Sequence, residues 1–300
     1  MNRVRKESGQ AILVTVVFMT ALLGTVALVV DVGSWFRTQR GLQATADAAA
    51  LAAAQALPDS PGTAGALASE FVTKNGGGTA VVTFATRLRP NDTVRVRLST
   101  NASGVFAKIF SVDSVEIGAR AAARAAIPGS ARWAAPIAVD ERHPLISGVG
   151  CPCFNEPTEL DLLKIGPGAF RLVNVDGSHG GTGPDTLGDW IRTGFSGYMP
   201  VDWYFSDSGV KFNSSQVVSA LDDRIGDVLL FPVYRETVAE GANFDYHVVG
   251  WVGFRLQSYQ IQGSKKNKLF GQFETIIWEG IQSESADDPD YGVRTIALVE

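Results

Sequence analysis

One segment near the N-terminus, Ala11–Val30, is predominantly apolar and contains neither a charged residue nor a proline. An α-helix of this length rises about 30 Å, which matches the hydrocarbon core of a bilayer. A helix in a globular core usually keeps a polar face, and a cleavable signal peptide usually has an apolar region of only about 7–15 residues. We therefore predict a retained transmembrane helix over residues 11–30, rather than a core helix or a signal peptide.

Basic residues flank this segment unevenly. Three precede it and two follow it: Arg3, Arg5, Lys6, Arg37 and Arg40. Because basic residues favour the cytoplasmic side of a membrane, we predict a cytoplasmic N-terminus over residues 1–10 and an extracytoplasmic body. Trp35 and Phe36 follow the segment at positions where aromatic side chains are expected to contact the membrane surface.

Alanine dominates the stretch that follows the apolar segment. No proline occurs between Ala11 and Pro58, and residues 42–57 read LQATADAAALAAAQAL. Alanine has the highest helix propensity, so we predict that the helix continues through residues 31–57. From Ala11 to Leu57 it would form a rod about 70 Å long. Small side chains let helices approach each other closely. The rod is therefore expected either to pack against other components of an assembly or to act as a solvated spacer.

Residues 58–128 carry both helix and strand signals. Two prolines end the rod, and a short helix is predicted over Ala64–Lys74. Two predicted strands, Thr79–Leu88 and Thr93–Thr100, are separated by turn-forming residues and indicate a hairpin. Val112–Ala126 forms either a strand or an alanine-rich helix. These elements predict a small α+β module.

Residues 129–300 are richer in aromatic residues and glycine and poorer in alanine. Many short β-type runs and few helical ones predict a mostly antiparallel, β-rich domain, and so an α+β fold class for the chain. The predicted strands are Leu160–Ile165, Phe170–Val175, Val228–Val238, His247–Gln262, Leu269–Trp278 and Thr295–Val299. Helices are predicted over Thr186–Thr193 and Ser215–Ile225. Gly250 and Gly253 interrupt a strand-like run and predict a bulge or a close backbone approach.

The charge of the chain argues against nucleic-acid binding. The formal net charge is −5, and the first ten residues are basic, so the remainder is acidic and lacks a basic footprint. Four arginines form either an anion-binding patch or, more simply for the first two, the solvated face of a strand: Arg95, Arg97, Arg120 and Arg124.

Catalytic and metal-binding motifs are incomplete. Asp176–Gly181 lacks the G-x-S-x-G nucleophile motif and is typical of a turn. Asp287, Asp288 and Asp290 lack the calcium-ligand pattern of an EF-hand, which favours a solvated acidic loop. We predict no enzymatic activity, no cofactor, no metal site and no small-molecule substrate.

The two cysteines of the chain, Cys151 and Cys153, are separated by one proline. This spacing differs from the C-x₂-C of zinc sites, although His143 and His179 could in principle complete a ligand set. Outside the cytoplasm the pair could form a tight disulfide. Free thiols and intermolecular bonds are the other interpretations.

A family resemblance rests on the order of motifs in residues 8–57. The motif residues are Gly9, Gln10, Asp31, Gly33, Leu42, Gln43 and Asp47, with the apolar run between Gln10 and Asp31. This order resembles the N-terminal region of TadG-like proteins of the Flp/Tad pilus-assembly system. Prepilins of that system carry a glutamate at the fifth position after the cleavage-site glycine, whereas Val14 stands fifth after Gly9. We therefore expect the helix to remain uncleaved.

The resemblance implies a single-pass, pseudopilin-like anchor with an extracytoplasmic body. It also implies a non-enzymatic role in building or anchoring adhesive pili. The implied partners are the lipid bilayer and other pilus-assembly proteins or pseudopilins, contacted through the alanine-rich helix. The alternative function is a membrane-tethered extracytoplasmic ligand-binding domain or hydrolase, which a convergent cluster of histidines and carboxylates after residue 129 would favour.

Overall fold

The computed structural model describes residues 8–162, 171–206, 211–240, 243–262 and 266–299. They form two compact units, Met1–Arg124 with Leu298–Glu300, and Ala125–Ala297. The first unit contains the long N-terminal helix, and the second is rich in mostly antiparallel strands, so the predicted α+β fold class is confirmed. The domain boundaries after residues 10, 30, 57 and 128 stay predictions.

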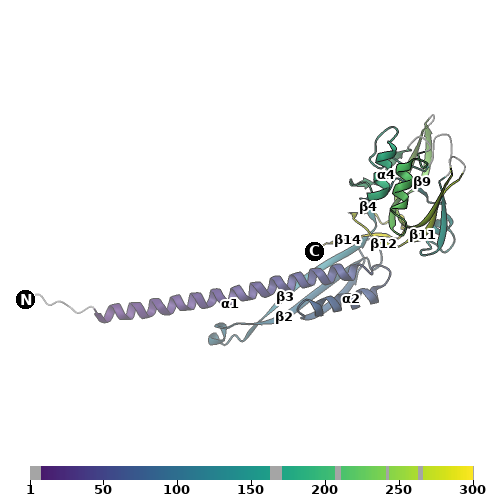
Figure 1. The fold of residues 1–300 in the computed structure, drawn as a ribbon. Coiled ribbons are helices and arrows are strands. Elements are labelled where there is room, and N and C mark those ends of the chain that lie inside the picture. The colour runs from purple at the N-terminus through teal and green to yellow at the C-terminus, as the bar shows by residue number, and fades with distance from the viewer. Residues whose placement is uncertain (1–7, 163–170, 207–210, 241–242, 263–265, 300) are drawn as a thin grey trace, which may run out of the picture. The chain divides into compact units, whose positions relative to one another are not determined.

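Helix α1 (Ser8–Ala54) dominates the first unit and is continuous over 47 residues (Figure 1). Neither Gly33 nor any other residue interrupts it, because no proline occurs before Pro58 and alanine supports helix to its end. Residues 55–59 form turns, which end the helix slightly before the predicted Leu57. Helix α2 (Pro61–Lys74) then begins with a proline at its first position, where no amide donor is needed.

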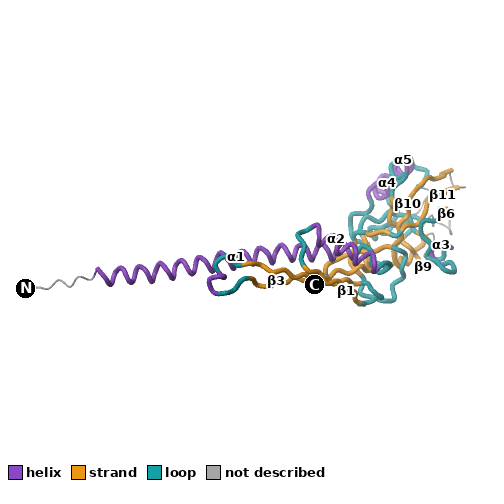
Figure 2. The backbone as a smooth tube through the Cα atoms, turned by 90° about the horizontal axis from the view of Figure 1, so that it is seen from below, coloured by secondary structure: helices purple, strands orange, loops and turns teal. Residues whose placement is uncertain are grey.

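An antiparallel sheet completes the first unit, in the order β1-β2-β3. Its strands run alongside the C-terminal half of α1 in both views (Figures 1 and 2). The strands are β1 (Thr79–Ala85), β2 (Thr93–Ser103) and β3 (Ser114–Ala126), with a short 3₁₀ helix η1 (Ala107–Phe110) between the last two. The antiparallel pairing of β1 with β2 confirms the predicted hairpin. Val112–Ala126, which the sequence predicted as either a strand or a helix, forms the strand β3. At the chain end, the Val299 amide donates to the Ala122 carbonyl at 2.8 Å.

The core of the first unit lies between the helices and one face of this sheet. Val94, Val96 and Leu98 are buried, whereas Arg95 and Arg97 between them are exposed, as the alternation of β2 requires. The facing side of α1 presents small side chains that exclude solvent almost completely. They are Ala46, Ala49, Ala50, Ala53 and Ala54, together with Leu42. Small residues allow the helix to lie close to its neighbours, and α1 contacts both α2 and β2.

The second unit is built around a sheet with the order β5-β9-β10-β11-β6, with β8 paired to β10. Its pairs are antiparallel except β5 with β9. A small sheet has the order β13-β4-β7, and β12 pairs with β14 in parallel. The strands are β4 (Pro128–Ala131), β5 (Val139–Asp140), β6 (Pro157–Asp161), β7 (Met199–Pro200), β8 (Trp203–Phe205), β9 (Val228–Glu240), β10 (Asn243–Gln262), β11 (Lys266–Glu274), β12 (Ile276–Ile277), β13 (Gly280–Gln282) and β14 (Val293–Leu298). The helices are α3 (Pro144–Ser147), α4 (Pro184–Thr193) and α5 (Ser215–Asp222).

The strongest sequence patterns of this unit correspond to its longest strands. The register of β9 and β10 shifts between Val248 and Gly250, which confirms the predicted bulge. A side chain at Gly253 would lie 2.8 Å from Ile276, so this glycine permits a close approach. The predicted strand at 170–175 is wrong for the residues described there, because Leu172 and Val173 make only isolated bridges. Residues 163–165 of another predicted strand lie outside the described residues.

Candidate anchor site

Residues 11–30, the apolar half of α1, expose a long hydrophobic surface. Its large side chains are exposed, with fractions that range from 44% at Leu22 to 69% at Val29. Burying one such side chain is worth about 1.5–3 kcal/mol, so this surface strongly favours an apolar environment. In the described part of the chain, α1 is the one helix long and apolar enough to cross a membrane.

Asp31 marks the end of this apolar surface. Although it follows Val30 directly, its carboxylate is buried and accepts three backbone N–H groups from the segment between β2 and β3. The donors are Val105 at 2.8 Å, Phe106 at 2.9 Å and Ala107 at 2.6 Å. Gly104 permits this approach, because a side chain there would lie 2.6 Å from the Ala107 Cβ and 3.1 Å from the Asp31 carboxylate. The residue therefore ties the helix to the sheet module where the apolar surface ends.

The same hydrogen bonds set the charge state of Asp31. Burial alone would raise its pKa, but the three amide donors outweigh burial and hold the pKa below its usual range. The carboxylate consequently stabilises the fold above its unfolded-state pKa of about 3.9, and this stabilisation is lost as the pH falls through the lower folded-state pKa.

We expect Asp31→Asn to lower the melting temperature of the detergent-solubilised protein near neutral pH, because an amide is a weaker acceptor than a carboxylate. As the pH falls below the unfolded-state pKa of about 3.9, the difference in melting temperature from wild type should narrow, since proton binding then increasingly favours the unfolded wild-type chain. Thermal unfolding followed across this pH range is the measurement. If the difference in melting temperature between the two proteins stays constant with pH, the charge of Asp31 does not stabilise the fold.

Gln43 makes a second link between α1 and the sheet. Its amide nitrogen donates to the Asp47 carboxylate one turn later and to the Arg120 carbonyl of β3, both at 2.8 Å. Gln43 therefore holds the helix against the strand, and Asp47, a second motif residue, accepts a hydrogen bond from Gln43 within the helix. Leu42 is buried beside them.

Replacing Gln43 by alanine is expected to lower the free energy of unfolding by about 1–2 kcal/mol, because both hydrogen bonds are lost and the Arg120 carbonyl loses its donor. Gln39→Ala is the matched control, since Gln39 is exposed one turn earlier on the same helix, and its effect should stay within about 0.5 kcal/mol. Chemical denaturation of the solubilised protein measures both. Equal effects of the two substitutions would contradict this role of Gln43.

Gly33, another motif residue, lies in the middle of α1. A side chain at Gly33 would meet nothing within 4 Å, so packing within the described chain does not require this glycine. Gly9 and Gln10 lie in the first turn of α1.

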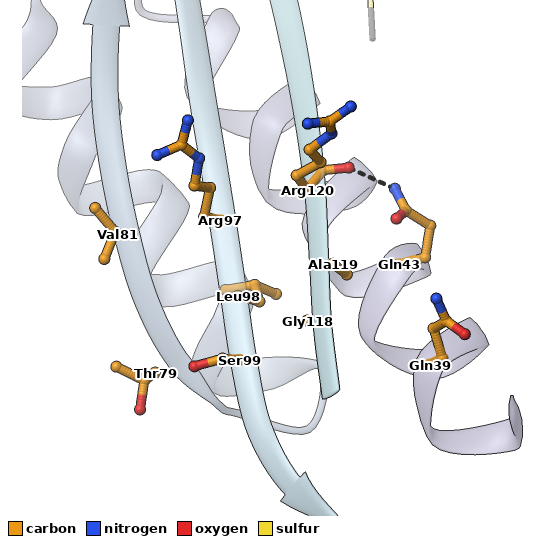
Figure 3. Close-up of a pocket in the computed structure, with 10 residues that line it drawn as sticks. All are labelled: Gln39, Gln43, Thr79, Val81, Arg97, Leu98, Ser99, Gly118, Ala119 and Arg120. Atoms are coloured by element: carbon orange, nitrogen blue, oxygen red, sulfur yellow. Dashed lines mark hydrogen bonds between the residues drawn. The ribbon is translucent and has the colours of Figure 1, made fainter. Parts of the chain in front are cut away.

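An open groove of about 540 Å³ lies beside this link, between α1 and the outer face of the sheet (Figure 3). Gln39 and Gln43 line one side, and Arg97 and Arg120 lie opposite each other in the strand register. None of its ten lining residues is a carboxylate, a histidine or a cysteine. Arg95, Arg97 and Arg120 are exposed, whereas Arg124 is buried and does not join them. Thr79 and Ser99 bring hydroxyl groups to the groove, but its lining holds no histidine or carboxylate that could activate them as a general base.

The candidate residues of the second unit take part in local structure. The Asp176 carboxylate accepts a hydrogen bond from the Ser178 amide at 2.9 Å, as is typical of the turn predicted there. His143 accepts the Leu145 amide at the start of α3, and burial lowers the pKa of His143. Asp290 pairs with Arg294 at 2.6 Å. Among the described residues, no group of three or more His, Cys, Asp or Glu could hold a metal ion.

Cys151 and Cys153 are joined by a disulfide, with their Cα atoms 4.6 Å apart. The oxidation state of this pair in the cell stays a prediction.

These features define a single-pass, membrane-anchored protein whose anchor helix continues into a packed sheet module. Residues 9–56 match the family model Tad, described as Flp pilus-assembly TadE/G-like, and this confirms the resemblance to TadG-like proteins. The matched region contains the apolar surface, Asp31 and the Gln43–Asp47 pair. Comparison with curated proteins gave no match, and neither did comparison with solved structures. The family match supports involvement in Flp/Tad pilus assembly, and this family is generally non-enzymatic.

Proposed function

We propose that this chain is a non-enzymatic, membrane-anchored component of Flp/Tad-type pilus assembly or anchoring, and that it contributes to adhesion through protein–protein contacts. The observation that carries the proposal is the coincidence of the family match with the anchor. Residues 9–56 include both the exposed apolar half of α1 and the residues that hold its other half against the sheet. A cytoplasmic N-terminus and an extracytoplasmic body belong to this proposal.

We do not expect the alanine-rich part of α1 to bind other proteins through its alanine face. Its small side chains are covered by α2 and the sheet of the same chain, so this face is not open to another protein. Contacts with other pilus-assembly proteins therefore use the apolar half of α1 within the membrane or the outer surface of the two units.

Deleting the gene tests this role. We expect fewer surface pili by electron microscopy and weaker attachment to surfaces, both restored by the wild-type gene supplied in trans. A clean deletion with normal pilus number and normal attachment would contradict the proposed function.

A further inference from the structure

A second apolar surface lies in the segment Val105–Val112, between β2 and β3. Its large apolar side chains point into solvent rather than into the core of the first unit. They are Val105, Phe106, Ile109, Phe110 and Val112, and Ile109 and Phe110 are 76% and 77% exposed. Contiguous exposed apolar surface of this kind marks a contact with a membrane or with another protein. The helix η1 within this segment makes no use of these side chains for packing, since none of its residues is buried.

The fold holds this segment beside the point where α1 leaves the membrane. Asp31, the first residue after the apolar run, binds the amides of Val105, Phe106 and Ala107. Trp35 lies one turn further along α1 and close to Gly104, which precedes the segment. In Figure 1 the link between β2 and β3 lies beside α1, at the end of the sheet that is nearer the N-terminus. The exposed side chains are therefore at the level of the membrane surface whenever residues 11–30 span the bilayer.

From this placement we infer that Val105–Val112 inserts into the interfacial region of the same bilayer that α1 crosses. This inference rests on the proposed membrane anchoring. Phenylalanine, isoleucine and valine side chains enter the boundary between headgroups and acyl chains, as the apolar faces of interfacial helices do. Lys108 is exposed within the segment and can extend its ammonium group to the lipid phosphates while its stem stays among the apolar groups.

Continuity with the transmembrane surface favours lipid over a protein as the occupant. The Asp31 hydrogen bonds fix the segment to the end of the span, so a bilayer around residues 11–30 reaches it without any further partner. The segment then gives the protein a second membrane contact. Two contacts restrict the tilt of α1 and the direction in which the sheet module faces, which a single helix leaves free.

Photolabelling of the full-length wild-type protein in phosphatidylcholine vesicles tests the inference. A fraction of the lipid carries a carbene-generating diazirine near the headgroup, and mass spectrometry identifies the labelled peptides. We expect label in residues 11–30 and in residues 105–112, but not around Val81. Val81 is a suitable control because it is 53% exposed and pairs with Arg97, about 20 Å along the strand from Ser103.

Matched variants test whether the exposed side chains of residues 105–112 themselves carry the lipid contact. Ile109→Ser with Phe110→Ser should lose the label in residues 105–112 and keep it in residues 11–30, whereas Val81→Ser should change neither. Both test side chains are exposed, so these substitutions leave the core intact. Label in residues 11–30 without label in residues 105–112 would overturn the inference, while membrane anchoring by α1 would still hold. The same result is expected if a second copy or another protein, rather than lipid, covers the segment. Absence of label from residues 11–30 would instead contradict the membrane anchoring itself.

Discussion

A full-length protein carrying Leu22→Arg and Leu23→Arg is expected to leave the membrane fraction. Both leucines are exposed near the middle of the apolar run, where they would face lipid. Placing an arginine at the centre of a transmembrane helix costs about 2.5–3.5 kcal/mol on insertion scales, so the pair costs roughly 5–7 kcal/mol. A cost of this size shifts the insertion equilibrium by more than about a thousandfold.

Flotation of cell lysates in a density gradient measures this effect, because membranes rise while aggregates and soluble protein remain below. The matched control is Gln39→Arg with Ala44→Arg, which adds the same two charges at exposed positions of α1 beyond the apolar run. The control should float with the membranes. If the variant with arginines at 22 and 23 also floats, residues 11–30 are not the anchor.

Ala46→Leu is expected to lower the free energy of unfolding of the first unit by about 1–3 kcal/mol, because enlarging a fully buried side chain in a packed core forces its neighbours apart. Ala46 lies on the face of α1 that packs within its own chain. Leucine and alanine have similar helix propensities, so the intrinsic preference for helix changes little.

Ala44→Leu is the control for this substitution, since Ala44 is exposed two residues earlier. Its effect should stay within about 0.5 kcal/mol. Amide hydrogen exchange of α2 and β2 in the solubilised protein reports the difference, with faster exchange expected in the Ala46→Leu protein alone. Equal exchange in the two variants would show that the alanine face tolerates large side chains and is not closely packed.

Patterns confined to a short stretch of sequence predicted their elements well. The apolar run and the alanine-rich stretch together predict the helix α1, and alternation in Val94, Val96 and Leu98 predicts the buried face of β2. In β3 the same signal fails, because alanine occupies both faces and favours a helix over a strand. The long strand β10 is recognisable because β-type residues continue through its two glycines.

Features that depend on distant contacts could not be predicted. Asp31 is a motif residue in the sequence, but its hydrogen bonds join residues about 75 positions apart along the chain. The apolar side chains around Ile109 cannot be distinguished from core residues in the sequence, and their exposure is visible only in the structure. Small side chains in residues 42–54 indicate close packing, yet they cannot distinguish a partner in another protein from the α2 helix and sheet of the same chain.

Protease treatment of spheroplasts tests the account most directly. We predict that protease added outside degrades the chain beyond residue 57, while an epitope tag placed before Met1 survives on a short fragment that contains residues 11–30. Breaking the membrane with detergent should then expose the tag as well. Full protection of the chain until detergent is added would contradict a single-pass anchor with an extracytoplasmic body.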